Sequence, residues 1–169
     1  MGMESVVYGF IQGPHWPHED AHNYDPGQEL NQLRRRYMEI DQKLREKVRF
    51  NLHAISTLPE DDAWPFLSRA MFSSSTHSIQ TTYKSQIIHF GASFKQIEWD
   101  WEEWLTKFEA LLRKMYWDEV HLHLLAEWLN FSPLHYIWKD EDEGKATSPD
   151  HPHPVARWTF LGGPRSFHE

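Results

Sequence analysis

The chain has 169 residues, 40% of them hydrophobic, which is enough to bury one sizeable core but short for two ordinary domains. Its 17 basic and 25 acidic residues give a formal charge of −8. This balance argues against nucleic acid or an anionic membrane as the partner, because both require a basic surface. The chain contains no cysteine, so disulfides, thiolate catalysis and thiolate metal sites are excluded.

Targeting signals are not visible in the sequence. No stretch approaches the roughly 18 consecutive apolar residues of a membrane helix. The first ten residues, MGMESVVYGF, lack the basic start and apolar run of a signal peptide. We therefore expect one domain, spanning residues 1–169, in the cytoplasm.

The first third of the chain predicts a strand and a long helix. Residues 5–12 are β-branched and aromatic and precede Gly13-Pro14, which predicts a strand. Residues 13–25 are polar and aperiodic and predict a loop. Asp25, followed by Pro26 and Gln28, predicts a helix start. Apolar residues spaced by three or four continue this helix for about eight turns to residue 55, either unbroken or with a kink. A helix across a sheet is favoured over a coiled coil.

The middle of the chain predicts a hairpin and a second amphipathic helix. Residues 59–64 predict a short helical turn, and residues 66–72 and 80–90 predict two strands around a Ser-rich turn. Ser93 and Gln96 have the capping-box spacing, so the next helix is expected to begin near Phe94. Its apolar residues fall on one face that must be buried, namely Ile97, Trp101, Trp104, Leu105, Phe108, Leu111, Leu112 and Met115.

The last third predicts the remaining strands. Residues 120–128 and 134–139 predict a hairpin, with a helical segment HLLAEWL as the alternative for the first of them. Residues 140–154 are charged and aperiodic and predict a loop, and residues 155–161 predict a last strand. The order of elements indicates an α+β domain with a mostly antiparallel sheet of about five to six strands and two main amphipathic helices.

Two histidine groups raise the question of a metal site. His15, His18 and His22 have a spacing at which imidazoles on a helical turn can share one zinc ion, but Pro17 argues against that helix, so a polar loop is favoured. His121 and His123 are two residues apart on a predicted strand and point to the same side, as a ligand pair or as part of a solvated sheet face. The solvated face is favoured, and we expect no metal and no cofactor.

Catalytic signatures are missing from the sequence. It has no G-x-S-x-G motif, and no glycine-rich segment is followed by a helix that could bind phosphate. Glu102 and Glu103 are adjacent on a helix and cannot both point into one cleft as an acid-base pair. We expect the protein not to be an enzyme.

One candidate binding surface lies at the start of the second helix. Trp99 falls about 200° from Ile97 on a helical wheel, away from the apolar face. Its neighbours Glu98, Asp100, Glu102 and Glu103 are acidic, and an exposed Trp among acidic residues suits a protein interface. The alternative is that a loop or strand covers Trp99. The acidic run Asp140, Glu141, Asp142 and Glu143 could extend this negative surface or be a solvated loop.

The central strand and helix also resemble a known class of proteins. The segments are IHFGASFK (residues 88–95) and WLTKFEALLRKMYW (residues 104–117), and more loosely residues 120–122 and 134–138. They resemble bacterial immunity proteins that accompany secreted polymorphic toxins of the Rhs and type VI effector kind. The resemblance implies a small cytoplasmic protein that binds and blocks one toxin domain, without catalysis or a cofactor. It carries over no functional residues, because such proteins have no invariant ones.

Three functional hypotheses follow. The favoured one is an immunity protein whose acidic surface meets a cognate toxin domain with a basic face. The second is a metal-dependent enzyme using His15, His18 and His22. The third is a structural or adaptor module that self-associates, for example as a homodimer, through its Trp-rich surface.

Overall fold

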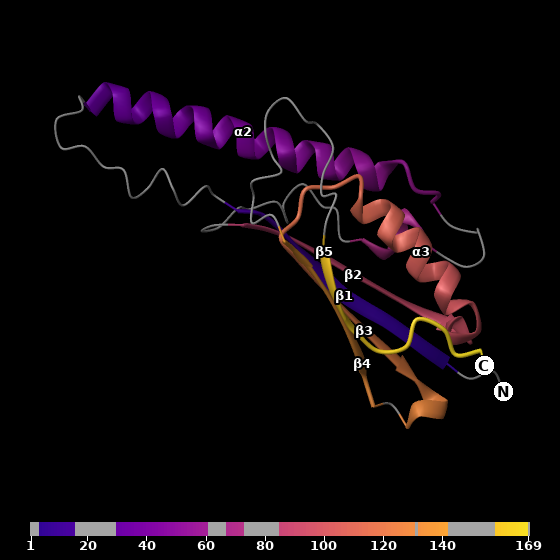
Figure 1. Cartoon of the computed structure of the whole chain (residues 1–169). Helices are drawn as coiled ribbons and strands as arrows, with labels where there is room; N and C mark the ends of the chain where they lie inside the picture. The colour runs from indigo at the N-terminus through magenta and orange to yellow at the C-terminus, as the bar shows by residue number, and fades with distance from the viewer. Residues whose placement is uncertain are drawn as a thin grey trace.

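The fold is a single antiparallel sheet with two helices on one side (Figure 1). The structure is a computed structural model, and it describes residues 4–15, 30–60, 67–72, 85–130, 132–141 and 158–168. Five strands are hydrogen-bonded in the order β2-β1-β3-β4-β5, and every pair is antiparallel. The predicted α+β class, with five strands and two main helices, is confirmed.

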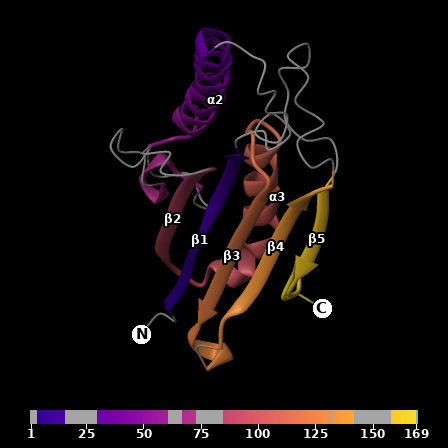
Figure 2. The same ribbon diagram turned by 90° about the vertical axis from the view of Figure 1, so that its left-hand side faces the viewer.

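The five strands lie side by side with α3 behind them (Figure 2). Their bounds are β1 (Glu4–His15), β2 (Ser85–Lys95), β3 (Glu119–Ala126), β4 (Leu134–Asp140) and β5 (Trp158–Gly162). β1 is central between β2 and β3, so that Tyr8 lies between Gly91 and His123. The predicted hairpin of β3 and β4 is confirmed, and β4 pairs with the predicted last strand, β5. Asn130, with φ of 54°, makes the left-handed turn of that hairpin, a backbone conformation that Asn tolerates.

The predicted start of the second helix is wrong. β2 continues to Lys95, because its last residues pair with the first residues of β1 and because Phe94 is buried in the sheet. Gln96 then reverses the chain in a left-handed conformation, with φ of 58°. A 3-10 turn, η2 (Ile97–Asp100), leads into α3 (Trp101–Leu112). Ser93 is therefore a strand residue and caps no helix.

The predicted strand at residues 66–72 is also wrong. Residues 69–71 form a 3-10 turn, η1 (Arg69–Met71), and within the described residues only Phe72 bridges to β2, at Phe90. Leu67, Met71 and Phe72 are all buried, a spacing that fits a helical turn better than the alternation of a strand. Residues 66 and 73–84 lie outside the described part of the chain, as do residues 61–64 of the predicted helical turn.

The long helix α2 (Leu30–Ser56) is unbroken over 27 residues. It meets the rest of the protein near its C-terminal end, where Val48, Ala54 and Ile55 are buried. Asn51 is buried there too and forms two hydrogen bonds with the backbone of Tyr116, donating to the carbonyl at 2.8 Å and accepting from the amide at 2.7 Å. Figure 1 shows the N-terminal half of α2 extending beyond the sheet. The predicted helix start at residues 25–28 lies outside the described residues.

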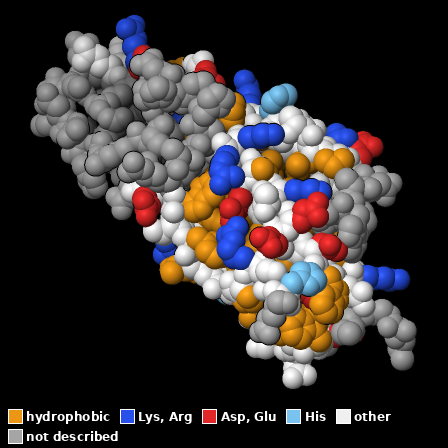
Figure 3. Space-filling model, turned by 45° about the vertical axis from the view of Figure 1, so that its right-hand side comes forward, with side chains coloured by type: hydrophobic (Ala, Val, Ile, Leu, Met, Phe, Trp, Pro, Cys, Tyr) orange, Lys and Arg blue, Asp and Glu red, His pale blue; other side chains and the backbone are white. Residues whose placement is uncertain are grey.

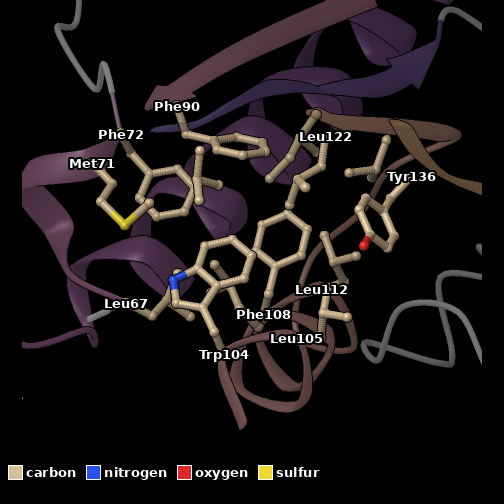
Figure 4. Close-up of a cluster of buried hydrophobic side chains, with 14 of the residues drawn as sticks. Leu67, Met71, Phe72, Phe90, Trp104, Leu105, Phe108, Leu112, Leu122 and Tyr136 are labelled. Atoms are coloured by element: carbon tan, nitrogen blue, oxygen red, sulfur yellow. The ribbon is translucent and has the colours of Figure 1, made fainter. Parts of the chain in front are cut away.

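The core lies between the sheet and α3 (Figure 4). All eight residues of the predicted apolar stripe, from Ile97 to Met115, are buried. Buried indoles need a partner for their N–H group, and Trp101 donates to the Tyr136 hydroxyl at 3.0 Å while Trp117 donates to the Leu112 carbonyl at 2.8 Å. The sheet face packed on α3 is therefore closed to partners, whereas no helix in the described part of the chain covers the opposite face, which we call the open face.

Candidate protein-binding site

Trp99 lies on the surface at the end of the sheet where β2 leaves it. The 3-10 turn η2 buries Ile97 completely and leaves the Trp99 side chain 51% exposed. The backbone amide of Trp99 donates to the Gln96 carbonyl at 3.2 Å, so the left-handed turn at Gln96 fixes where the indole emerges. An indole half out of water on a well-packed turn has the character of a binding anchor.

Glu98 departs from the predicted acidic surface. Its side chain is 2% exposed and accepts a hydrogen bond at Oε2 from the hydroxyl of Ser5, which is itself fully buried in β1. Side chains of successive residues in a 3-10 turn point about 120° apart, so Glu98 points toward Ser5 of β1 while Trp99 points to solvent. Among the described residues, Oε1 of Glu98 has no hydrogen-bond partner. Glu98 is a buried carboxyl group and takes no part in the surface around Trp99.

The remaining acidic residues do surround Trp99. Glu102 and Glu103 are exposed in the first turn of α3, and Asp100 is half-buried before it. We call these three residues the acidic turn. Within it Glu103 forms an i,i+4 ion pair with Lys107, at 3.6 Å, with both side chains largely in solvent. Lys107 offsets the charge of one of the three acidic side chains, so the acidic turn and Lys107 together stay net negative.

The C-terminal segment brings further aromatic residues to this surface. His168 donates from Nε2 to the Trp99 carbonyl oxygen, and its ring centroid lies 5.4 Å from that of Trp99. The preceding residue, Phe167, packs edge-on against Trp128 with centroids 5.4 Å apart. Trp128 is 46% exposed. Two ring pairs, Trp99 with His168 and Trp128 with Phe167, are thus linked through adjacent residues of the C-terminal segment, and we call these four side chains the aromatic end.

Two contacts anchor the C-terminal segment before it reaches the aromatic end. The Tyr136 hydroxyl donates to the Pro164 carbonyl at 2.7 Å, and Arg165 pairs with Glu109 at 2.7 Å while lying over the Phe160 ring. Burial raises the pKa of Tyr136 to about 12, opposed by the hydrogen bond from Trp101 and by the charge of Arg165. Tyr136 therefore stays protonated and remains a hydrogen-bond donor over the physiological pH range.

Figure 3 shows hydrophobic side chains beside a histidine at the lower end of the molecule, where Figure 1 places the termini.

Sequence reasoning found only Trp99 of the aromatic end. Trp128 fell within a predicted strand, but it lies in a 3-10 turn, η3 (Glu127–Leu129), where the alternation of β3 ends. Phe167 and His168 follow the last strand and carry no periodic signal. The only hint in the sequence was the unusual number of nine Trp residues, too many for each to be assigned to a predicted buried face.

The second acidic run does not join the acidic turn. Asp140 and Glu141 lie at the far end of the sheet, because Lys139 pairs with Glu119, which pairs with Gln12, whereas Lys95 pairs with Glu4. The strand between Glu4 and Gln12 spans about 26 Å at roughly 3.3 Å per residue. Asp142 and Glu143 lie outside the described residues. The predicted extension of one negative surface is wrong for Asp140 and Glu141.

The histidine groups do not form a metal centre in the described part of the chain. His15 ends β1, while His18 and His22 lie outside the described residues. His121 and His123 point to the same side of the sheet, as predicted, and His135 from β4 joins them. Their rings stack, with centroids 4.3 Å apart for His123 and His135, rather than converging on a point. No group of three or more His, Asp or Glu side chains among the described residues could hold a metal ion.

These three histidines instead form a hydrogen-bonded and stacked row on the open face. His121 donates from Nε2 to the Glu119 carboxylate, which leaves Nδ1 of neutral His121 to accept from Nε2 of His135 at 2.9 Å. Tyr8 stacks on His123 at 4.8 Å, and Phe10 stacks on His121 at 4.7 Å. Burial lowers the pKa of His123, and the charges of His135 and His121 lower it further. Burial and the charge of His121 lower the pKa of His135.

Two further findings concern membrane-spanning helices and similarity to known proteins. None of the helices within the described residues is both long and apolar enough to cross a membrane. The chain matches no family model, and comparison with curated proteins and with solved structures gives no match. The assignment of the site therefore depends on the geometry of its own residues.

Proposed function

We propose that this protein is an immunity protein that binds a cognate secreted bacterial toxin in the cytoplasm and neutralises it by contact, without catalysis. The resemblance of residues 88–95 and 104–117 to such proteins supplies the class. The observation that supports a binding role is Trp99, which is half-exposed on the turn η2, is followed in the chain by the acidic turn and contacts the ring of His168.

The physical chemistry of the site suits a basic partner. Trp is the residue most enriched among binding hot spots, and its ring loses little conformational entropy when a partner covers it. Asp100, Glu102 and Glu103 surround it with negative charge, and the whole chain carries −8. Opposite charge on a toxin domain accelerates encounter and discriminates against wrong partners. A toxin that acts on nucleic acid has such a basic face, because its substrate demands one.

Co-expression with the toxin encoded beside this gene tests the proposal. We expect the protein to suppress killing and to form a complex that survives size-exclusion chromatography. Trp99→Ala should weaken the complex by about 2 kcal/mol or more, or roughly thirtyfold, as truncation of an interface hot spot does. The control is Met38→Ala, which removes another exposed hydrophobic side chain, 71% exposed, from α2 far from the site.

Two outcomes would contradict this proposal. Undiminished killing in the presence of the folded protein would exclude an immunity role for that toxin. A stable complex that Trp99→Ala and Met38→Ala weaken equally would show that the aromatic end is not the interface. Circular dichroism of both variants establishes that each remains folded, which is expected because both side chains are largely in solvent.

A further inference from the structure

The open face of the sheet is a second surface with the composition of an interface. Helices α2 and α3 both lie on the other side of the sheet (Figure 1). In the part of the chain that the structure describes, the centre of the open face consists of Tyr8, Phe10, His121, His123, His135 and Ile137. Apolar exposure continues to both edge strands, where Ile87 is 43% and Leu161 62% exposed. A solvated antiparallel face is ordinarily polar, so this one calls for a partner.

We propose that two copies of this chain associate through their open faces, packing sheet against sheet about a two-fold axis. This surface is distinct from the aromatic end, and the inference does not depend on the proposed immunity function. A two-fold interface brings the same patch of each copy together, so the patch must be compatible with itself in shape, charge and size. The open face meets these requirements in three ways.

The charge of the open face permits self-association of an acidic protein. Two molecules of charge −8 repel each other, and contact through the acidic turn would add to that repulsion. The centre of the open face instead carries no formal charge when its histidines are neutral. Its two ends each hold one acid and one base paired across strands, Glu4 with Lys95 and Glu119 with Lys139. Each of these cross-strand pairs therefore brings no net charge to the other copy, and Asp140 and Glu141 lie beyond the Glu119–Lys139 pair at one end.

The size of the open face approaches that of a standard dimer interface. Five strands about 4.8 Å apart make a width of roughly 24 Å, and eight residues along β1 make a length of about 26 Å. The flat area of the face is therefore about 600 Å², without the additional area of protruding side chains. This area approaches the roughly 800 Å² per partner of a standard interface. Two twisted sheets can pack face to face about 10 Å apart with their side chains interdigitated.

The shape of the centre is already fixed in one copy. Phe10, His121, His135, His123 and Tyr8 form a continuous stack, with neighbouring ring centroids between 4.3 and 5.1 Å apart. The hydrogen bonds from His135 to His121 and from His121 to Glu119 hold the middle of that stack. Rings that are ordered beforehand lose little entropy when a second copy covers them.

Sedimentation velocity over a range of protein concentrations tests the proposal. The chain should show a reversible monomer–dimer equilibrium near neutral pH. Tyr8→Arg and Leu161→Arg each place a charge on the open face without disturbing the core, and each should weaken the dimer by about tenfold or more. Trp128→Arg, at a residue of similar exposure on the aromatic end, is the matched control and should leave the dimer unchanged.

Single-cysteine labelling gives an independent measurement, because the natural chain has no cysteine. A spin label at Tyr8→Cys should show a short distance between copies, whereas one at Trp128→Cys should not. A monomer at every concentration would overturn the proposal. So would a dimer that responds to Trp128→Arg and not to Tyr8→Arg. A chain that stays monomeric but loses toxin binding on Tyr8→Arg would assign the open face to the toxin instead.

Discussion

His168 holds Trp99 by both its backbone and its ring, donating from Nε2 to the carbonyl oxygen and lying 5.4 Å away between ring centroids. A carbonyl oxygen can only accept, so the proton of neutral His168 lies on Nε2. The residue next to it, Phe167, contacts Trp128. Two consecutive residues near the C-terminus thus position both exposed indoles of the aromatic end. Ordering a side chain before binding reduces the entropy that binding must remove.

If the protein binds a toxin through Trp99 as we propose, His168→Ala should weaken that binding through its effect on Trp99. We expect a loss of about 0.5–1.5 kcal/mol, the cost of immobilising one freed side chain, which is smaller than the loss from Trp99→Ala. The double variant should bind no more weakly than Trp99→Ala alone, because His168 acts through Trp99. Calorimetric titration of the toxin into the natural protein, the two single variants and the double variant completes this double-mutant cycle. Additive losses would show that His168 contacts the toxin itself, and His53→Ala on α2 is the control.

The hydrogen bond between Ser5 and Glu98 should contribute to folding. Ser5→Ala leaves the buried Glu98 carboxylate without this donor, at a cost of about 1–3 kcal/mol in the free energy of unfolding. Glu98→Gln should cost less, because the amide oxygen of glutamine can still accept a hydrogen bond from Ser5. Urea denaturation of the natural protein, Ser5→Ala and Glu98→Gln measures the free energy of unfolding of each. Ser93→Ala, at an exposed position of β2, should change stability by less than about 0.5 kcal/mol. An equal effect of Ser5→Ala and Ser93→Ala would contradict this role.

The sequence was most informative where one physical signal dominated. The stripe from Ile97 to Met115 was predictable because helical periodicity and burial agree over many residues. The start of α3 was not, because the capping pattern at Ser93 competed with pairing between β2 and β1, and such pairing depends on a strand about 90 residues away. Local signals cannot decide between a cap and a distant strand partner.

The candidate site was predictable only in part, for the same reason. A helical wheel placed Trp99 off the core, which the structure bears out. Glu98 was assigned to the same surface as a sequence neighbour of Trp99, but it is buried because it accepts a hydrogen bond from Ser5 of β1, a contact that no local pattern shows. Trp128, Phe167 and His168 reach the aromatic end through tertiary contacts between η3, η2 and the C-terminal segment. No spacing in the sequence records such contacts.

The close approach of β1 and β3 at Gly9 leaves no room for a larger side chain at this position. A Cβ atom at Gly9 would overlap the backbone carbonyl of His121 and lie 2.8 Å from the Phe90 ring. Gly9→Ala must therefore push two central strands apart, and we expect a loss of about 1–3 kcal/mol in the free energy of unfolding. Gly91→Ala, beside Tyr8 on the neighbouring strand, meets nothing closer than 3.5 Å and is the matched control. Thermal unfolding of both variants measures the difference, and equal stability would refute the steric argument.

The histidine row should make the protein less stable as pH falls below neutrality. His123 lies between the rings of Tyr8 and His135, and its Nδ1 atom is buried without a hydrogen-bond partner among the described residues. A proton there would be poorly solvated, and it would repel a charge on His135 or His121. Burial and these charges lower the pKa of His123, and burial and the charge of His121 lower that of His135, below the ordinary 6.5. Other groups facing the row are Glu119, which accepts from His121, Lys139 beside Glu119, and His89 across Phe10.

The sign of the effect follows from proton uptake. The unfolded chain binds protons on these histidines near pH 6.5, whereas the folded chain resists them until a lower pH. Their stabilising contribution is therefore complete above pH 6.5 and is lost as the pH falls from there through the folded-state pKa values. Urea denaturation between about pH 7.5 and about pH 5.5 measures how steeply the free energy of unfolding falls with pH. His123→Phe keeps a flat ring against Tyr8 and His135 but cannot take up a proton, so its stability should fall less steeply. If the stability of His123→Phe falls with pH as steeply as that of the natural protein, the histidine row does not carry the pH dependence.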